Sequence, residues 1–167
     1  KSGVGYSIGY NYSDKVNLSF GFGYNSTKNF SGINSNVYIQ DNIGNFNQFT
    51  FNFSISLDSR NDNFYPTNGV LNQIKFELSP TAISDDSYSK FRFTNDLYFG
   101  NSKNDNFLFL SNRLGLANSL DGNLKTINAF SLGGINFKGF DYRGIGSTDG
   151  QVYLGGNNFY TSTLGFG

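Results

Sequence analysis

The chain has 167 residues, and its 12 Lys and Arg side chains balance its 12 Asp and Glu side chains at pH 7. A balanced charge gives no whole-chain reason to expect a nucleic-acid partner. The chain has no Cys and no His, which excludes a disulfide framework and a thiolate metal site and removes the commonest general base. We therefore expect a protein that is not an enzyme, with no catalytic residues, no cofactor, no metal and no nucleic-acid partner.

Aromatic residues make up 18% of the chain, all of them Phe or Tyr, whereas hydrophobic residues of every kind make up only 37%. A soluble core of this size is normally built from Leu, Ile, Val and Ala. Phe and Tyr interspersed with Gly, Asn and Ser indicate instead a β-sheet with one aromatic face and one small, hydrated face. No run approaches the roughly 18 apolar residues of a transmembrane helix, but a β-barrel spans a membrane without one.

The first two predicted strands form a hairpin around residues 13–15. Apolar and small residues alternate on both arms, and the apolar positions are Val4, Tyr6, Ile8, Tyr10, Tyr12, Val16, Leu18, Phe20, Phe22 and Tyr24. Pairing about Asp14 places Tyr10 opposite Leu18 and brings all of these side chains to one face. Each arm has about ten residues, the length of a tilted transmembrane strand, whereas strands of soluble sheets average about five or six.

The same alternation predicts five further strands, which cover residues 49–57, 70–78, 90–99, 108–116 and 159–167. The connections alternate between short or compact ones, at 13–15, 58–69 and 101–106, and long ones, at 26–48, 79–87 and 118–157. Outer-membrane barrels show this asymmetry, with tight periplasmic turns and longer extracellular loops. We therefore predict an all-β fold, an antiparallel segment of about seven strands from a transmembrane β-barrel.

Two Asn residues provide a test of the register between the strands at 90–99 and 108–116. Asn95 and Asn112 interrupt apolar faces, and a hairpin centred on residues 103–104 places them opposite each other, where their amides can satisfy one another. The same register brings Asp96 near Arg113 on the hydrated face. We predict lumen charges on that face at Lys75, Glu77, Arg92, Asp96 and Arg113.

Two acidic stretches have simpler interpretations than a metal site. Asp58 and Asp62 in the compact connection carry oxygen ligands of the kind that calcium accepts. The segment lacks the glycine and the terminal Glu spacing of a calcium loop, which favours turn chemistry. Asp85 and Asp86 in the connection at 79–87 are expected to form a solvated loop tip.

Two motifs resemble the BamA-type family of outer-membrane assembly factors. Asp58 and Arg60, followed by Pro66 and Gly69, are similar to the Asp-x-Arg…Pro-Thr-x-Gly turn of that family. The segment Phe137-Lys138-Gly139-Phe140 resembles the Arg-Gly-Phe signature of the family's sixth extracellular loop. Glycines flank this second motif, at Gly133, Gly134, Gly155 and Gly156. The order of the two motifs and the strands between them extend the resemblance over nearly the whole chain.

The resemblance implies a barrel of 16 strands preceded by periplasmic POTRA domains. On this mapping, residues 1–167 are part of a C-terminal barrel domain, from about the sixth strand to the twelfth, and the POTRA domains and remaining strands lie outside the chain. The implied function is that of a non-enzymatic assembly factor, integral to a Gram-negative type of outer membrane, that folds and inserts other β-barrel proteins. The implied partners are the outer-membrane lipid bilayer, unfolded client proteins and accessory lipoproteins of an assembly complex.

The resemblance also implies a role for the loop motif. In the family the loop arginine reaches into the lumen and meets acidic groups on the following strands. Lys138 takes its place here, and Gly165 stands where relatives often carry an acid. Lysine lacks the bidentate fork of arginine, so we expect a looser ionic contact. Phe137 and Phe140 are expected to pack on the inner face of the sheet, with Gly139 allowing close approach.

Three alternatives stay open at the level of the sequence. A secretion translocator of the same superfamily carries the same loop motif and would pass an unfolded polypeptide through its lumen. A simple outer-membrane porin would use the long loop only to narrow its channel. A soluble ligand-binding barrel is disfavoured, because the aromatic face would have to fill a lumen too small for it.

Overall fold

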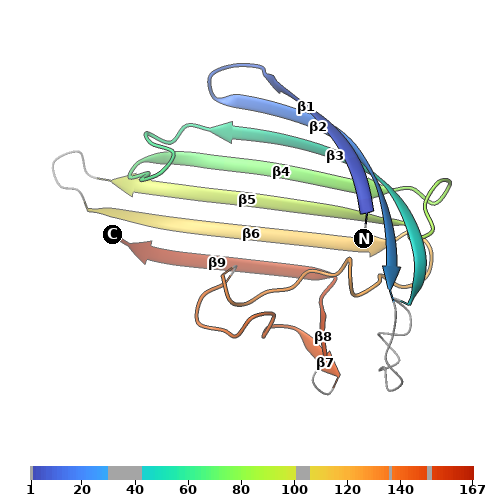
Figure 1. The fold of residues 1–167 in the computed structure, drawn as a ribbon. Coiled ribbons are helices and arrows are strands. Elements are labelled where there is room, and N and C mark those ends of the chain that lie inside the picture. Colours follow the sequence, from blue (N-terminus) through green and yellow to red (C-terminus); the bar gives the residue numbers. More distant parts are fainter. Residues whose placement is uncertain (1, 30–42, 101–105, 136, 150–151) are drawn as a thin grey trace.

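The computed structural model describes residues 2–29, 43–100, 106–135, 137–149 and 152–167 (Figure 1). Seven strands form one antiparallel sheet in the order β1-β2-β3-β4-β5-β6-β9. Their bounds are β1 Ser2–Asn11, β2 Val16–Asn29, β3 Gly44–Asp58, β4 Gly69–Ser79, β5 Tyr88–Gly100, β6 Phe107–Ser119 and β9 Asn158–Phe166. The predicted all-β antiparallel fold is confirmed. Among the described residues, no helix is long and apolar enough to cross a membrane.

The long loop, which we define as residues 120–157, separates β6 from β9. It contains a small two-stranded sheet of β7 (Ser147–Asp149) and β8 (Val152–Gly155), which the sequence did not predict. The loop begins after Ser119 rather than at residue 118, because β6 continues three residues beyond the predicted end of the strand at residue 116. Both ends of the loop therefore emerge from strands that are paired with each other.

The strand register follows the predicted one. β1 pairs with β2 so that Tyr10 faces Leu18, and β5 pairs with β6 so that Asn95 faces Asn112. Consecutive strands up to β6 are neighbours in space, as expected for short antiparallel connections. β9 joins the sheet next to β6 only after the long loop has been traversed.

β2 and β3 are longer than the sequence predicted. The connection expected at residues 26–48 is partly strand, since β2 ends at Asn29 and β3 begins at Gly44, and these two residues pair. The paired residues at this end are mostly polar on both faces, so the alternation disappears there although the backbone ladder continues. Residues 30–42 of that connection lie outside the described residues, as does nearly all of the turn at 101–106.

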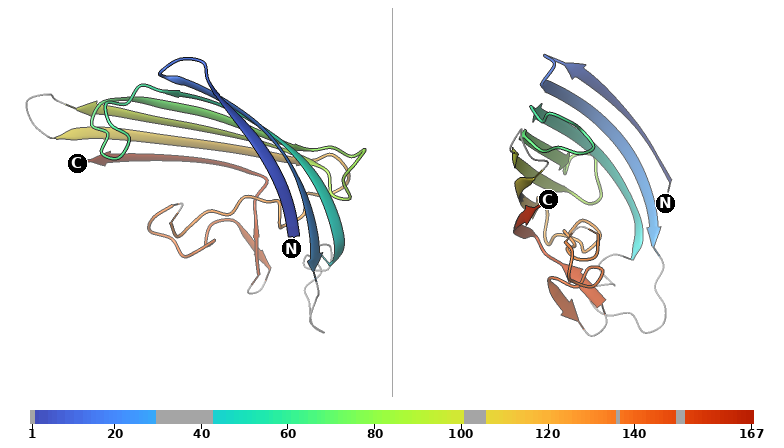
Figure 2. Two further views of the ribbon diagram at one scale, coloured as in Figure 1. Left: turned by 45° about the horizontal axis from the view of Figure 1, so that its top comes forward. Right: turned by 90° about the vertical axis from the view of Figure 1, so that its left-hand side faces the viewer.

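The sheet is curved, and the long loop lies against its concave side (Figure 2). The convex face carries the predicted aromatic rows, and these side chains are exposed: Tyr6 by 59%, Phe22 by 52% and Phe53 by 44%. Among the described residues, the buried hydrophobic side chains are Tyr88, Ala117 and Phe130. They belong to the concave side, since Tyr88 contacts Glu77, Ala117 is the register partner of Lys90, and Phe130 contacts Lys90. A sheet whose open face is aromatic and whose covered face is polar suits a surrounding of hydrocarbon.

The concave face also carries aromatic rings, whereas the composition indicated a small, hydrated face. Three of them lie over glycines of the neighbouring strand, so that a Cβ atom at each glycine would overlap the ring: Phe159 over Gly115, Phe109 over Gly165 and Phe107 over Gly167. The position of Gly165, where relatives of the BamA type often carry an acid, is thus covered by the ring of Phe109.

A row of polar side chains crosses the convex face. Its members, which we call the polar row, are the register partners Asn72 of β4, Asn95 of β5, Asn112 of β6 and Ser162 of β9. Asn95 Nδ2 donates to Asn72 Oδ1 at 2.8 Å, and Asn112 Nδ2 donates to Asn95 Oδ1 at 3.2 Å. The hydroxyl of Tyr160 donates to Asn112 Oδ1 at 3.0 Å. The predicted pairing of Asn95 with Asn112 is confirmed, within a longer row that satisfies amides on an otherwise apolar face.

Candidate functional site

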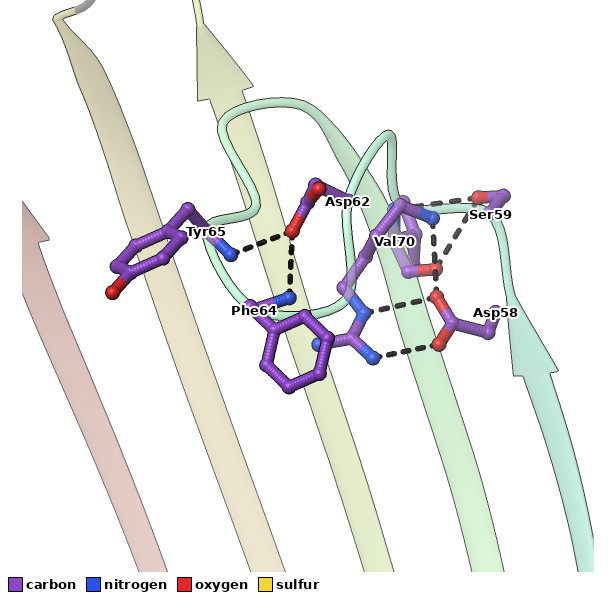
Figure 3. Close-up of polar contacts among 7 residues, drawn as sticks. Asp58, Ser59, Asp62, Phe64, Tyr65 and Val70 are labelled. Carbon is purple, nitrogen blue, oxygen red and sulfur yellow. Dashed lines mark hydrogen bonds and ion pairs between the residues drawn. The ribbon is translucent and has the colours of Figure 1, made fainter.

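The compact turn, residues 58–69 between β3 and β4, is held by contacts among its own residues (Figure 3). Arg60 donates to both carboxylate oxygens of Asp58, from Nε at 2.9 Å and from Nη2 at 2.7 Å. The backbone N–H of Arg60 reaches the same carboxylate at 3.1 Å. This bidentate contact raises the pKa of Arg60 above its ordinary value. Asp58 and Arg60, two of the predicted site residues, are therefore brought together.

The far side of the compact turn is ordered by Asp62 and Asn61. Asp62 Oδ1 accepts from the backbone N–H groups of Tyr65 and Phe64 at 2.8 Å and 2.7 Å, which lower the pKa of this exposed carboxyl. Asn61 Oδ1 accepts from the backbone N–H groups of Thr67 and Asn68 at 3.0 Å and 2.9 Å. These are the turn contacts that the sequence favoured over calcium binding.

Pro66 and Gly69 shape the return of the compact turn into β4. Pro66 is half-buried and has a fixed φ. Gly69 has a φ of 108°, and a Cβ atom there would overlap the carbonyl oxygen of Ser59. Gly69 is therefore required both by its backbone conformation and by the close approach of the chain.

Two aromatic residues of the compact turn were not among the predicted site residues. Phe64 and Tyr65 are 87% and 86% exposed, although their backbone N–H groups are fixed by Asp62. The turn crosses the end of β5 on its concave side, because a Cβ atom at Gly100 would overlap the carbonyl oxygen of Thr67. Two exposed rings are thus displayed at this end of the sheet by a rigid support.

The five predicted lumen charges lie on the concave face of β4, β5 and β6. Lys75 is opposite Arg92, and Glu77 is opposite Lys90. Arg113 Nη2 lies 3.6 Å from Asp96 Oδ1, and Ser111 Oγ donates to the same oxygen at 2.6 Å. Asp96 is buried, whereas the Arg113 side chain is 43% exposed.

The remaining charges of this face contact aromatic rings or a hydroxyl. The Arg92 guanidinium lies 5.4 Å from the ring centre of Phe130 in the long loop. Glu77 Oε1 accepts from the hydroxyl of Tyr88 at 2.7 Å. Lys90, the register partner of Glu77, was not among the predicted site residues, and it is buried beside the rings of Tyr88 and Phe130. The long loop and the charged face therefore meet at Phe130.

Backbone pairing closes the base of the long loop. The N–H of Phe130 donates to the carbonyl of Gly156 at 2.9 Å, and the N–H of Gly156 donates back to Phe130 at 2.9 Å. Further out, Ile145 N donates to the carbonyl of Leu132 at 3.2 Å. The outgoing and returning branches of the loop are therefore joined to each other before the chain enters β9.

Three of the four flanking glycines of the long loop are needed for its conformation. Gly133, Gly134 and Gly155 have φ values of 117°, 63° and 78°. A Cβ atom at Gly133 would overlap the carbonyl oxygen of Asp141, and one at Gly155 would lie 2.5 Å from the carbonyl oxygen of Phe130. Gly156 has room for a Cβ atom, since its nearest neighbour would lie at 3.6 Å.

The loop motif itself is placed differently from the expectation. The rings of Phe137 and Phe140 stack on each other with centres 5.6 Å apart, and Phe140 is 52% exposed. Within the described part of the chain, Lys138 is exposed and forms no ion pair. Gly139 has a φ of 92° and open space around its Cβ position. The expectation that Gly139 allows close approach is wrong, because this glycine serves the backbone conformation instead.

A ring that the sequence analysis did not select makes the contact with the concave face. Phe130 is only 8% exposed, and its ring meets that of Phe159 on β9 edge-on, with centres 4.9 Å apart. Lys90 and Arg92 of β5 lie against the same ring. Phe130 stands seven residues before the motif, in a stretch without periodicity, so only the tertiary structure reveals it.

Asp86 was also placed wrongly from the sequence. It was expected at a solvated loop tip, but it is only 5% exposed. Its Oδ2 accepts from Gln48 Nε2 at 3.0 Å and from Asn128 Nδ2 at 2.6 Å. Burial raises the pKa of this carboxyl above its ordinary value. Asp85, by contrast, is exposed, as expected for the pair.

The fold and this loop together define a class of protein. A curved antiparallel sheet with long strands, an outward aromatic face and a loop folded on its inner face is a segment of an outer-membrane type of β-barrel. The chain belongs to the Omp85 superfamily, whose domain model matches residues 1–166.

A solved structure supports the same assignment of the fold. The chain resembles BamA from Haemophilus ducreyi, in a crystal structure that lacks POTRA domains 1–3, with a TM-score of 0.84 and 20% sequence identity. The likeness covers 97% of this chain and 36% of that one, so the chain spans about a third of the length of its structural relative. No curated protein sequence matches the chain. The BamA-type resemblance inferred from the two motifs is confirmed.

Proposed function

We propose that the chain forms part of the barrel of an assembly factor that folds and inserts other β-barrel proteins into the outer membrane. The observation that supports this function is the long loop, which is folded on the concave face of an aromatic-faced sheet in a member of the Omp85 superfamily. The partners would be the lipid bilayer of a Gram-negative type of outer membrane, unfolded client proteins and accessory lipoproteins.

In this proposal the chain corresponds to about the sixth to the twelfth strand of a 16-stranded barrel. β1 and β9 are the two edges of the described sheet, and their unpaired backbone groups would need partner strands in hydrocarbon. Further barrel strands on both sides supply those partners. The compact turn then lies at the periplasmic rim, and the long loop enters the lumen from the outside.

The proposed mechanism needs no chemical step. An incoming client strand pairs with an open edge of the barrel, because an edge offers unpaired N–H and C=O groups. That edge belongs to the seam between the first and last strands of the barrel, far from the residues of this chain. This chain supplies the stable wall opposite the seam and the loop that braces the lumen. Lys138 at the exposed tip of the loop is available to meet a carboxylate on another part of the barrel.

Reconstitution of the complete protein tests the function. A urea-unfolded client barrel is added to liposomes with and without the protein, and its folding is followed by its heat-sensitive shift in gel mobility. Faster folding in the presence of the protein is expected. Deleting residues 131–154 of the long loop removes the motif but leaves the base of the loop, and is expected to slow client folding. Equal rates with and without the protein would refute the proposal.

The same liposomes separate the alternatives. A secretion translocator would deliver an unfolded polypeptide into the vesicle interior, where added protease does not reach it. A porin would make the vesicles swell in small sugars without accelerating client folding. Either result, obtained without client folding, would replace the assembly function with the corresponding alternative.

A further inference from the structure

Asp86 is the point at which three separate segments of the chain meet. Gln48 comes from β3, Asp86 from the connection between β4 and β5, and Asn128 from the outgoing branch of the long loop. All three side chains are buried, with exposures of 5%, 5% and 7%. We call these three residues the anchor. The donor atom of Asn128 lies 2.6 Å from the carboxylate oxygen, closer than the donor atom of Gln48 at 3.0 Å. Hydrogen bonds to an ionised carboxylate are stronger than those between neutral groups.

The carboxylate of Asp86 is positioned by the sheet and not by the loop. Ser79 at the end of β4 is fully buried, and its hydroxyl donates to the backbone carbonyl of Asp86 at 2.8 Å. The neighbouring Asp85 is bound to Asn47 of β3 in both directions, by its backbone N–H at 2.9 Å and by its carboxylate at 2.8 Å. Asp86 is therefore a fixed part of the barrel wall, and Asn128 is the loop residue that docks on it.

The ring of Phe130 adds a second contact two residues further along. It lies on Phe159 and beside Lys90 and Arg92, and its backbone pairs with Gly156 on the returning branch. The anchor and this ring therefore fix both branches of the loop at its base. The motif at Lys138 lies ten residues beyond Asn128, at the exposed part of the loop.

A buried carboxylate depends on its hydrogen-bond partners. When Asn128 leaves, Asp86 loses its shortest contact and must be hydrated again, so the position of the loop and the environment of the carboxylate are coupled. We propose that Asp86 is a positioning residue, which holds the long loop in the lumen through Asn128 and so keeps the barrel competent for assembly. This inference rests on the proposed function for its consequence, but the docking itself is independent of that function.

A polarity swap tests the anchor. Asn128→Asp places two carboxylates against each other at the position of the 2.6 Å contact, and their repulsion should release the base of the loop at pH 7.5. Adding Asp86→Asn to this variant restores one donor and one carboxylate with their places exchanged. Asn128→Ala removes the contact without adding charge, and Asp85→Asn is the matched control, since its amide oxygen can still accept from Asn47.

Trypsin cleavage after Lys125 of the complete protein in liposomes reports loop release. We expect about a tenfold faster cleavage in Asn128→Asp and a smaller rise in Asn128→Ala, because a hydrogen bond to a charged group is lost. The swap should return the rate to within about twofold of the parent, and the Asp85 control should leave it unchanged. The rate of client folding should fall most in Asn128→Asp and less in Asn128→Ala, and it should recover in the double variant.

The outcomes are separable. Unchanged cleavage in Asn128→Asp and Asn128→Ala, or a swap that fails to recover although its heat-sensitive gel mobility shows a folded barrel, would overturn the positioning role. If the cleavage rates follow the expected order but the protein folds no client, the positioning role of Asp86 is supported and the assembly function is refuted. If Asn128→Asp fails to assemble, Asn128→Ala decides the question by the same cleavage measurement.

Discussion

The compact turn and the long loop each contain one of the two motifs that resemble the BamA-type family, yet they are stabilised in opposite ways. In the compact turn Asp58 binds Arg60, two residues away, and Asp62 binds the backbone of Phe64 and Tyr65. The long loop is held at its base by residues of β3, β5, β9 and the connection between β4 and β5. The turn has its partners within its own sequence, whereas the loop takes them from the sheet.

This difference explains why the contacts that stabilise the compact turn can be predicted from the sequence, whereas those that hold the long loop cannot. A turn built from local contacts shows its turn-forming residues together in one short stretch. The residues that hold the long loop are dispersed, since Asp86 and Asn128 are separated by 42 positions. The motif around Lys138 marks the loop without marking the place where the described residues fix it.

We expect the largest loss of stability from a substitution at Gly133 of the long loop, and Gly139 in the same loop provides the comparison. Gly133→Ala should destabilise the loop by about 3 kcal/mol, since it combines a positive φ with overlap of the Asp141 carbonyl. Gly139→Ala has a positive φ but open space, so it should cost only about 1 kcal/mol. Hydrogen exchange of the loop amides in the complete protein measures both. Equal effects at the two sites would contradict the crowded geometry at Gly133.

The next largest loss of stability should be confined to the compact turn and leave the long loop unaffected. Asp58→Asn removes the bidentate ion pair with Arg60 and should destabilise the turn by about 2 kcal/mol, because both side chains are mostly buried. Exchange of the Asn68 amide should rise, while the long loop stays as protected as in the parent. Asp62→Asn is the control, since an amide oxygen can still accept from both backbone N–H groups. A simultaneous loss of protection in the loop would show that the two regions are not independent.

A smaller effect concerns the sheet that connects the two regions. The polar row runs from β4, which leaves the compact turn, through β6, which enters the long loop, to β9. Asn95→Leu should destabilise the barrel by about 1 kcal/mol, because Asn72 and Asn112 lose their partner on a face in hydrocarbon. Replacing all three Asn by Leu should cost less than the sum of the single changes. Additive losses in urea titrations would argue against a coupled row.

The smallest effect is the pH dependence of the loop. Burial outweighs the lowering effects of Lys125, Gln48 and Asn128 and raises the pKa of Asp86 above its ordinary value of 3.8. The docked state therefore retains the proton at pH values where a fully solvated Asp86 has lost it. Docking should therefore be strongest below the ordinary pKa and weaken as the pH rises through the raised pKa. Hydrogen exchange at several pH values, corrected for the intrinsic rate, should show this slope, and Asp86→Asn should remove it. A slope of the opposite sign would mean that the partners of the carboxylate outweigh its burial.

Much of the fold could be predicted because a transmembrane strand repeats every two residues and a short turn fixes the pairing. Tyr10 opposite Leu18 and Asn95 opposite Asn112 follow from those two rules alone. The continuation of β2 to Asn29 could not be predicted, since polar residues on both faces leave no alternation. Asp86 was placed in solvent because a carboxylate in a polar segment gives no sign of the partner that buries it.

The rings that cover glycines on β6 and β9 bear on how this pair of strands keeps its alignment. In a hairpin the turn sets the register, but residues 120–157 are too long a connection to do so. Phe109 over Gly165 and Phe159 over Gly115 fit only one alignment, since a two-residue slide would press Phe159 against Arg113 or Ala117. Residues of β6 and β9 themselves therefore fix the register of this strand pair. The long loop between them can lengthen or shorten without changing that register.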